Sequence, residues 1–313
     1  MPPSGGGVRR PEVAVRVLLT GASSGFGRTT AARLAASPGV DLVVGGRRAA
    51  PVGTGLPLDL SSLSEVRSFA ESVEQHLAGR PLDGLILNAG VVRGDVAGRT
   101  EDGFETAFAV NHLAHYLLLR LLMPRLGDGA VIVMTTSGTH DPTLNAGLEA
   151  PRHADVELLA HPERDPALHP RPGRAGQHAY SASKLCTVLT VRALAERAET
   201  VDGRWSVVAY DPGQVFGTGL VSDLSLPRRM AWAVFGTPLG APVRHLSATA
   251  NDRRTAGLTL ARLALGERRP PPGRSYAALR RGRLGWPEPS ELARQPGLAA
   301  TVWDRSAELV GLV

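Results

Sequence analysis

The chain contains 313 residues, of which 43% are hydrophobic, and it is long enough for one large α/β domain or two small ones. Its formal net charge is +6, but the arginines are scattered and aromatic residues make up only 4%, which argues against a nucleic-acid partner. The single cysteine, Cys186, excludes an internal disulfide and any multi-cysteine metal site, and it fits a reducing compartment.

The start of the chain predicts neither a signal peptide nor a membrane anchor. Residues 1–12 have no apolar core after their first charges, so we expect a disordered tail. No apolar run approaches the roughly 20 residues of a membrane span, since even the run at 115–122 is interrupted by Arg120. We therefore expect a cytoplasmic protein without a membrane span, with residues 13–313 forming a single domain.

The first predicted unit consists of a strand, a glycine-rich turn and a helix. Residues 13–20 are apolar, the turn carries Gly21, Gly25 and Gly27, and residues 28–36 are rich in alanine. This order is typical of a dinucleotide-binding unit, in which the glycines let the backbone approach a pyrophosphate and the amides of the helix start meet its charge. Because the spacing is Gly-x3-Gly-x-Gly, an ordinary glycine turn is the alternative.

The second predicted strand, at 40–44, ends in two glycines followed by Arg47 and Arg48. An acidic residue at this place would bind the ribose hydroxyl of NAD, whereas arginine suits the 2′-phosphate of NADP. We therefore expect NADP(H), with Arg47 as the first candidate for the phosphate. Arginine is the default cation throughout this chain, so an incidental surface position for Arg47 is the alternative.

The third predicted strand, at 56–60, carries Asp59 near its end. Ser61 or Ser62 then caps a helix that reaches about residue 77. Asp59 is either a contact to adenine or a turn carboxylate.

The fourth predicted strand, at 82–87, stops at Asn88. The carboxyl end of a parallel strand is where a ligand would lie. A helix over 100–123 follows, with Asn111 in its first half; an asparagine inside a helix either faces water or has a specific role. The fifth predicted strand, at 131–135, runs into Thr136, Ser137 and Gly138.

Residues 139–176 break the alternation of strands and helices. They are rich in proline, histidine, arginine and acidic residues, with a brief helical signal near 156–160. A loop of this length is usually a functional lid or a disordered insertion. Its histidines have no spacing that resembles a ligand set, so we expect no metal.

Tyr180 and Lys184 lie four residues apart in the next predicted helix, which runs to about residue 197, and they therefore share a face. Lys184 is the only lysine among 35 lysines and arginines, which indicates a position where a compact ammonium is needed. An ammonium near a phenol lowers its pKa, about 10 in model compounds, and makes Tyr180 a proton donor or acceptor. A polar pair without a catalytic role is the alternative.

The sixth predicted strand, at 205–210, is followed by Asp211, Pro212 and Gly213. Strands that alternate with helices in this way predict an α/β fold with a Rossmann-type, doubly wound parallel sheet. Residues 220–313 would form the substrate pocket and the C-terminal region. Within them we expect helices near 228–235 and 253–265, a short strand near 275–279 and a helical tail over 289–312.

Taken in order, these motifs resemble the short-chain dehydrogenase/reductase family over about residues 13–220. The motifs are the glycine turn after Thr20, Asn88-Ala89-Gly90, Asn111, Ser137, Tyr180-x3-Lys184 and Pro212-Gly213. Other stretches look like the branch that contains retinol dehydrogenases and protochlorophyllide reductases, namely 59–63, 137–142, 180–186, 211–213 and 303–306. The insertion at 139–176 departs from the compact family pattern, and we expect it to loop out and overhang the substrate pocket.

The resemblance implies a role for each matching position. Tyr180 would be the catalytic acid or base, and Lys184 would hold the nicotinamide ribose while lowering the tyrosine pKa. Ser137 would hydrogen-bond the substrate carbonyl, and Asn111 would position a water in a proton relay. The cofactor would contact Gly21, Ser23, Gly25, Phe26 and Gly27 at the pyrophosphate, Arg47 at the 2′-phosphate, Asp59 and Leu60 at the adenine, Asn88, Ala89 and Gly90 at the adenine ribose, and Pro212 and Gly213 at the nicotinamide.

The resemblance also implies an oxidoreductase that interconverts a carbonyl and an alcohol. Apolar residues within 220–239, with Trp232 and Phe235, suggest a lipophilic ketone, aldehyde or alcohol as substrate. A non-catalytic NADP(H)-binding sensor or scaffold on the same fold is the alternative. The family implies a homodimer or homotetramer, whereas the insertion and the extended C-terminus could favour a monomer.

Overall fold

The computed structural model describes residues 15–200, 204–216, 247 and 249–313. The predicted tail at 1–12, the predicted helix near 228–235 and the apolar candidates at 220–239 lie outside the described residues.

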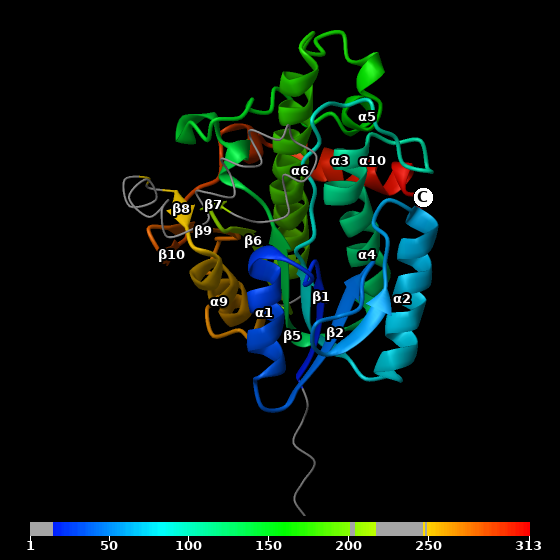
Figure 1. Cartoon of the computed structure of the whole chain (residues 1–313), viewed down its shortest axis with the longest axis vertical. Coiled ribbons are helices and arrows are strands. Elements are labelled where there is room, and N and C mark those ends of the chain that lie inside the picture. The colour runs from blue at the N-terminus through cyan, green and yellow to red at the C-terminus, as the bar shows by residue number, and fades with distance from the viewer. Residues whose placement is uncertain (1–14, 201–203, 217–246, 248) are drawn as a thin grey trace, which may run out of the picture.

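A sheet of eight strands, in the order β10-β9-β6-β5-β4-β1-β2-β3, forms the centre of the molecule (Figure 1). Its strand pairings are parallel except that between β9 and β10, which is antiparallel. The inner strands are apolar on both faces because helices cover both sides of the sheet. The strands are β1 (Val15–Thr20), β2 (Val40–Gly46), β3 (Thr54–Pro57), β4 (Leu82–Leu87), β5 (Leu126–Thr135), β6 (Ser206–Asp211), β9 (Tyr276–Arg280) and β10 (Arg283–Gly285).

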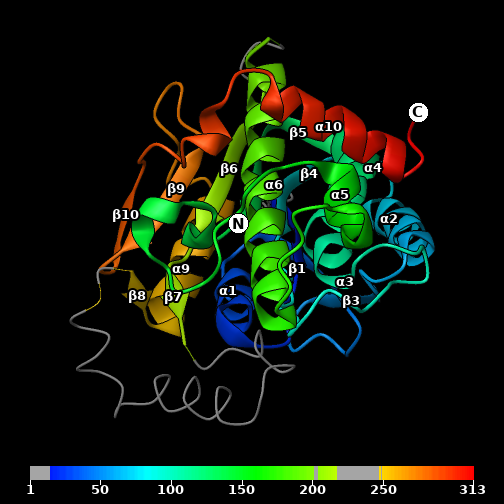
Figure 2. The same ribbon diagram turned by 90° about the horizontal axis from the view of Figure 1, so that it is seen from above.

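Helices cover the two faces of the sheet and bury a separate hydrophobic cluster on each side. Helices α1 (Gly25–Ala35) and α9 (Arg253–Ala264) pack against each other on one face. The other face is covered by α2 (Leu63–Leu77), α4 (Ala114–Leu122) and α6 (Pro172–Thr200). Figure 2 shows α10 (Leu298–Leu309) as an outer layer beside α6 and α4.

The predicted doubly wound parallel sheet in one domain is confirmed. The sequence indicated six strands and a short seventh, and the predicted strand near 275–279 is β9. Strand β10 was missed because it is three residues long and partly exposed. A separate parallel pair, β7 (Gln214–Val215) and β8 (Ala250–Asn251), was also missed, since two residues are too few to show a period.

The helix predicted over 100–123 is wrong at its start. Residues 100–104 form a turn in which Thr100 N donates to Phe104 O at 2.9 Å, and the helix α3 (Thr106–Phe108) begins after it. The buried carboxylate of Glu105 caps this start by accepting the amides of Ala107 and Phe108. A π-helical turn, Ala109–Leu113, then joins α3 to α4 and contains Asn111.

The insertion is packed against the body of the domain. It contains α5 (Val156–Ala160), as predicted, and 3₁₀ turns at Pro142–Leu144 and Pro162–Arg164. Ala160 O accepts the amide of Glu105 at 2.9 Å, which ties α5 to the start of α3. Helix α6 begins at Pro172, so the last residues of the predicted loop belong to the helix that carries Tyr180.

The C-terminal helix is joined to the domain by Trp303, which is 5% exposed. Its indole ring contacts Arg120 of α4 and Arg197 of α6, whose guanidinium carbons are 5.0 and 4.6 Å from the ring centroid. Tyr116 donates its hydroxyl to the backbone oxygen of Trp303 at 2.7 Å. These contacts place α10 over both helices.

We expect Trp303→Ala to lower the free energy of unfolding by about 3 to 5 kcal/mol, because it removes a large buried ring and leaves a cavity between helices. Urea denaturation monitored by circular dichroism would measure the change. Trp286→Ala is the matched control, because Trp286 is only half-buried and should cost less. Equal losses in the two variants would contradict an anchoring role for Trp303.

Candidate active site

A cavity of about 890 Å³ opens at the carboxyl ends of β1, β2, β4, β5 and β6. It lies where the strand order reverses beside β1, which is the place where open parallel sheets bind ligands. Except for Asn111, every site residue predicted from the sequence lines this cavity. These residues are Gly21, Ser23, Gly25, Phe26, Gly27, Arg47, Asp59, Leu60, Asn88, Ala89, Gly90, Ser137, Tyr180, Lys184, Pro212 and Gly213.

Close packing of the backbone requires glycine at two positions of the turn after β1. Gly21 has φ +76°, and a Cβ there would lie 2.7 Å from the Cα of Ala89. A Cβ on Gly27 would lie 2.2 Å from the backbone oxygen of Gly21. Larger residues at either position would push the turn away from β4 and α1.

The start of α1 lies at the cavity. Ser24 occupies the N-cap position, but its side chain makes no capping hydrogen bond, and the first turn contains no acidic residue. The first amides of a helix have no partner within it, and the helix dipole adds partial positive charge there. Ser24, Gly25, Phe26 and Gly27 all line the cavity, so this end of the cavity suits an anion.

The far end of the cavity beyond β2 is basic. Arg47 and Arg48 directly follow β2 and line the cavity, and neither of these two positions carries an acidic residue. Asp59 follows the neighbouring strand β3 and also lines the cavity, and its carboxylate accepts hydrogen bonds from the amide and hydroxyl of Ser61 at 2.9 and 2.7 Å. Asp59 therefore acts as a turn carboxylate in the structure. Its contact to adenine stays a prediction, at a position that lines the cavity.

Asn88 joins the ends of three neighbouring strands. Its side-chain nitrogen donates to the backbone oxygens of Thr20 and Gly21 at 3.3 and 3.2 Å, and its side-chain oxygen accepts the Thr135 hydroxyl at 3.1 Å. The Thr20 hydroxyl in turn accepts the amides of Asn88 and Ala89 at 2.9 and 3.1 Å. This network holds β1, β4 and β5 together at the floor of the cavity.

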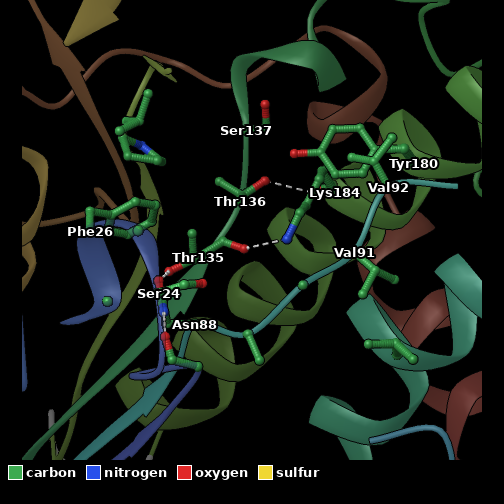
Figure 3. A pocket seen from close by; sticks show the side chains of 18 of the residues that line it. Ser24, Phe26, Asn88, Val91, Val92, Thr135, Thr136, Ser137, Tyr180 and Lys184 are labelled. Carbon is green, nitrogen blue, oxygen red and sulfur yellow. Dashed lines mark hydrogen bonds between the residues drawn. The ribbon is translucent and has the colours of Figure 1, made fainter. Parts of the chain in front are cut away.

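Lys184 lies buried beside this floor with 3% of its surface exposed. Its ammonium donates to the backbone oxygen of Thr135 at 3.0 Å, and the hydroxyl of Thr136 donates to the backbone oxygen of Lys184 at 2.8 Å. Burial lowers the pKa of Lys184 to about 8, so the ammonium is still the main form at neutral pH. Figure 3 shows Lys184 reaching between Thr135 and Tyr180.

Tyr180 is 6% exposed and directs its hydroxyl toward Ser137 (Figure 3). Burial raises the pKa of Tyr180 to about 12, while the Ser137 hydroxyl lowers it and the charge of Asp211 raises it. In the protein alone the Tyr180 pKa lies above its ordinary value, and a lowering of this pKa by Lys184 stays a prediction. Its ammonium is 5.9 Å from the tyrosine ring centroid, and loss of solvent outweighs any attraction at that range.

Asn111 lies behind the cavity wall. Its side-chain oxygen accepts the amide of Val91 at 2.8 Å, and its side-chain nitrogen donates to the Val91 oxygen and the Ser183 hydroxyl at 2.9 and 3.1 Å. Asn111 thus fixes the segment after β4 and links it to α6, the helix of Tyr180. In the structure the polar atoms of the Asn111 side chain bond to Val91 and Ser183. The water-positioning role implied by the resemblance stays a prediction.

Two contributions to the site had not been predicted. Asn251 donates from its side-chain nitrogen to the backbone oxygens of Pro212 and Leu279, both at 2.9 Å, and so holds the turn after β6 against β9. Gln177 lines the cavity one helical turn before Tyr180, a position that the helical spacing could have indicated. Gln177 also accepts the amide of Glu149 at 3.3 Å, and residues 146–148 of the insertion next to it form part of the wall, consistent with the expected place of the insertion over the pocket.

No group of histidine, cysteine, aspartate or glutamate side chains in the described part of the chain is arranged to hold a metal ion. Within the same residues, none of the helices is both long and apolar enough to cross a membrane. The polar side chains that meet beside the start of α1 include the phenol of Tyr180, the ammonium of Lys184 and the hydroxyl of Ser137.

This fold, with a cavity at the point where the strand order reverses, is that of a Rossmann-type protein. A model of the short chain dehydrogenases matches residues 15–146. Mouse retinol dehydrogenase 14 is 32% identical over 257 residues, which cover 71% of this chain and 70% of that protein. Protochlorophyllide reductase A of rice is 28% identical over 328 residues, covering 95% of this chain and 81% of its own. The chain belongs to the short-chain dehydrogenase family, whose fold binds a nicotinamide cofactor.

Solved structures show the same architecture. The crystal structure of an uncharacterized protein from Mycobacterium paratuberculosis superposes with a TM-score of 0.65 at 27% identity, covering 96% of this chain and 95% of that one. The NADPH-bound carbonyl reductase from chicken fatty liver has a TM-score of 0.54 at 18% identity, covering 81% of this chain and 88% of its own, and shares the fold.

We expect Asn88→Ala to lower the free energy of unfolding by about 2 to 3 kcal/mol, because three side-chain hydrogen bonds between strand ends are lost. Thermal and urea unfolding would measure this loss. Asn145→Gly is the matched control, since Asn145 is exposed with φ +45° and glycine tolerates that conformation. An Asn88 variant as stable as the control would show that the three strand ends do not depend on this side chain.

Proposed function

We propose that the protein is an NADP(H)-dependent oxidoreductase that reduces a lipophilic ketone or aldehyde, with Tyr180 as the proton donor. The observation that carries this proposal is the convergence of the Tyr180 phenol, the Ser137 hydroxyl and the buried Lys184 ammonium on one cavity. A non-catalytic sensor would not need these three groups together.

The cavity suits a dinucleotide phosphate. The uncapped start of α1 would hold the pyrophosphate through Gly21, Ser23, Gly25, Phe26 and Gly27. Arg47 would bind the 2′-phosphate, because a guanidinium matches a phosphate in charge and geometry.

The remaining contacts follow the walls of the cavity. Asp59 and Leu60 would face the adenine, Asn88 to Gly90 its ribose, and Lys184 the nicotinamide ribose. Pro212 and Gly213 would contact the nicotinamide, which supplies a hydride when bound.

The protonation states favour reduction. A pKa of about 12 keeps Tyr180 protonated at neutral pH, which is the form that can donate a proton to a carbonyl oxygen. The Ser137 hydroxyl, toward which Tyr180 points, would donate a hydrogen bond to the same oxygen. When the proton leaves Tyr180, the nearby Lys184 ammonium would stabilise the phenolate.

The cavity also has apolar lining residues that would face the substrate. Val92, Val110, Leu148 and Val215 line it together with the polar groups of the site. An apolar pocket with a few directed polar groups selects a lipophilic molecule and orients its reactive carbonyl. Two relatives of this chain are named for lipophilic alcohols, mouse retinol dehydrogenase 14 and mouse polyprenol dehydrogenase.

The first test is NADPH consumption with a panel of lipophilic aldehydes and ketones. We expect Tyr180→Phe to lower turnover by about 10²-fold or more while NADPH binding changes little, because only the transferred proton is lost. Tyr210→Phe is the matched control; its hydroxyl bonds to Ala256 O at 3.0 Å, away from the cavity, so turnover should persist. NADPH binding without turnover in the unchanged protein would favour the sensor function instead.

The second test concerns the choice of cofactor. We expect Arg47→Ser to lower the kcat/KM ratio of NADPH to NADH by about 10-fold or more, because a hydrogen bond to a charged phosphate is lost while NADH binding is kept. Arg294→Ser removes the same charge from an exposed position outside the cavity and should leave the ratio unchanged. An unchanged ratio in Arg47→Ser would show that Arg47 is an incidental surface residue.

A further inference from the structure

Asp211 is a fully buried carboxylate that the mechanism above does not use. It is the last residue of β6, directly before the Pro212-Gly213 turn, and none of its surface is exposed. A buried charge is costly unless it is paired and hydrogen-bonded, so its partners explain why the fold retains it.

The carboxylate is paired with two residues of β9. Its Oδ2 atom accepts the hydroxyl of Tyr276 at 2.9 Å and the Nη2 of Arg280 at 2.6 Å. The parallel register sets Asp211 beside Ala278, so Tyr276 and Arg280, two residues on either side, point to the same face of the sheet. The other oxygen, Oδ1, accepts the amide of Gly213 at 2.8 Å and closes the turn.

The same group supports the turn that carries Ser137. A Cβ on Gly138 would lie 3.0 Å from Asp211 Oδ2 and 3.2 Å from Arg280 Nη2, so the backbone after Ser137 passes directly against the ion pair. The buried ring of His140 packs edge-on against Tyr276 at a centroid distance of 5.1 Å. Its Nε2 accepts the amide of Ser290, which leaves Nδ1 to donate to the Ser137 oxygen at 2.7 Å.

Asp211 also acts on Tyr180 through its charge. Its negative charge raises the tyrosine pKa, and Arg280 supplies the compensating positive charge. The polar and ionisable groups around Tyr180 come from several elements: Lys184 on α6, Ser137 and His140 after β5, Asp211 at the end of β6, and Tyr276 and Arg280 on β9. Asp211 is the acidic side chain among these groups, so its ion pair with Arg280 determines the net charge beside Tyr180.

We propose that the Asp211–Arg280 ion pair is a positioning unit for the reaction, which fixes the Ser137 and Pro212-Gly213 turns and balances the charge beside Tyr180. The unit rests on the proposed function of Tyr180 as proton donor. Neither residue lines the cavity, so both act through the groups they hold and not by contact with substrate.

The test compares opposite changes of charge at nearly constant shape. Asp211→Asn removes the negative charge and should move the midpoint of the pH–kcat profile for NADPH-dependent reduction down by about one unit. Arg280→Gln leaves Asp211 unbalanced and should move the midpoint up by a similar amount. The double variant should return close to the unchanged protein, and Arg280→Lys should stay near it.

Two further measurements separate positioning from general damage. Both single variants should raise the KM for NADPH several-fold, because the Gly213 turn loses part of its support, while thermal unfolding shows that they remain folded. Arg283→Gln removes one positive charge from the exposed edge strand β10 and should alter neither KM nor midpoint. A fall in kcat with no opposed shift of the midpoints would overturn the proposal and leave the pair a packing feature only.

A measurement without turnover keeps this proposal distinct from the proposed function. The protein has four tyrosines, and 3-fluorotyrosine labelling followed by ¹⁹F NMR resolves their titration, with Tyr180→Phe identifying the Tyr180 signal. That signal should titrate at lower pH in Asp211→Asn and at higher pH in Arg280→Gln. Absence of turnover together with these shifts would refute only the proposed function, whereas turnover without these shifts would refute only the role of the ion pair.

Discussion

The structure depends on the way in which three parallel strands end at the same level. β1, β4 and β5 meet at Asn88, whose amide side chain bonds to Thr20 and Gly21 on one side and to Thr135 on the other. At this level the helices leave the sheet in different directions, and a cavity opens between them. Without these hydrogen bonds of Asn88, the glycine turn and the Thr135 carbonyl that binds Lys184 would lack a common support.

The only lysine in the chain lies where that support and α6 meet. A compact ammonium can reach the single carbonyl of Thr135 while it remains beside Tyr180, whereas a planar guanidinium would need more partners in a space that is almost closed to solvent. Burial shifts the pKa values of the two groups in opposite directions. It lowers the pKa of Lys184 to about 8 and raises the pKa of Tyr180 to about 12. Both groups are therefore mainly protonated at neutral pH.

The C-terminal third of the domain supports the site. β9 contributes Tyr276 and Arg280 to the carboxylate of Asp211, and Asn251 holds the neighbouring turn by its Pro212 oxygen. Helix α10 covers α4 and α6 through Trp303, and the insertion reaches the cavity at residues 146–148. The motifs thus supply the chemistry, and these later segments hold it in position.

The sequence by itself determined the alternation of strands and helices and the parallel sheet, and the site residues predicted from it line the cavity, except for Asn111. Apolar period, glycine spacing and strand ends are local properties, so the chain itself carries them. Only the tertiary structure decided that Asn111 lies behind the wall in a π-helical turn, that the helix after residue 100 begins at Thr106, and that burial raises the pKa of Tyr180. It also decided the partners of Asp211, which are 65 and 69 residues away. Desolvation and long-range pairing depend on what the fold brings together, and no spacing along the chain encodes that.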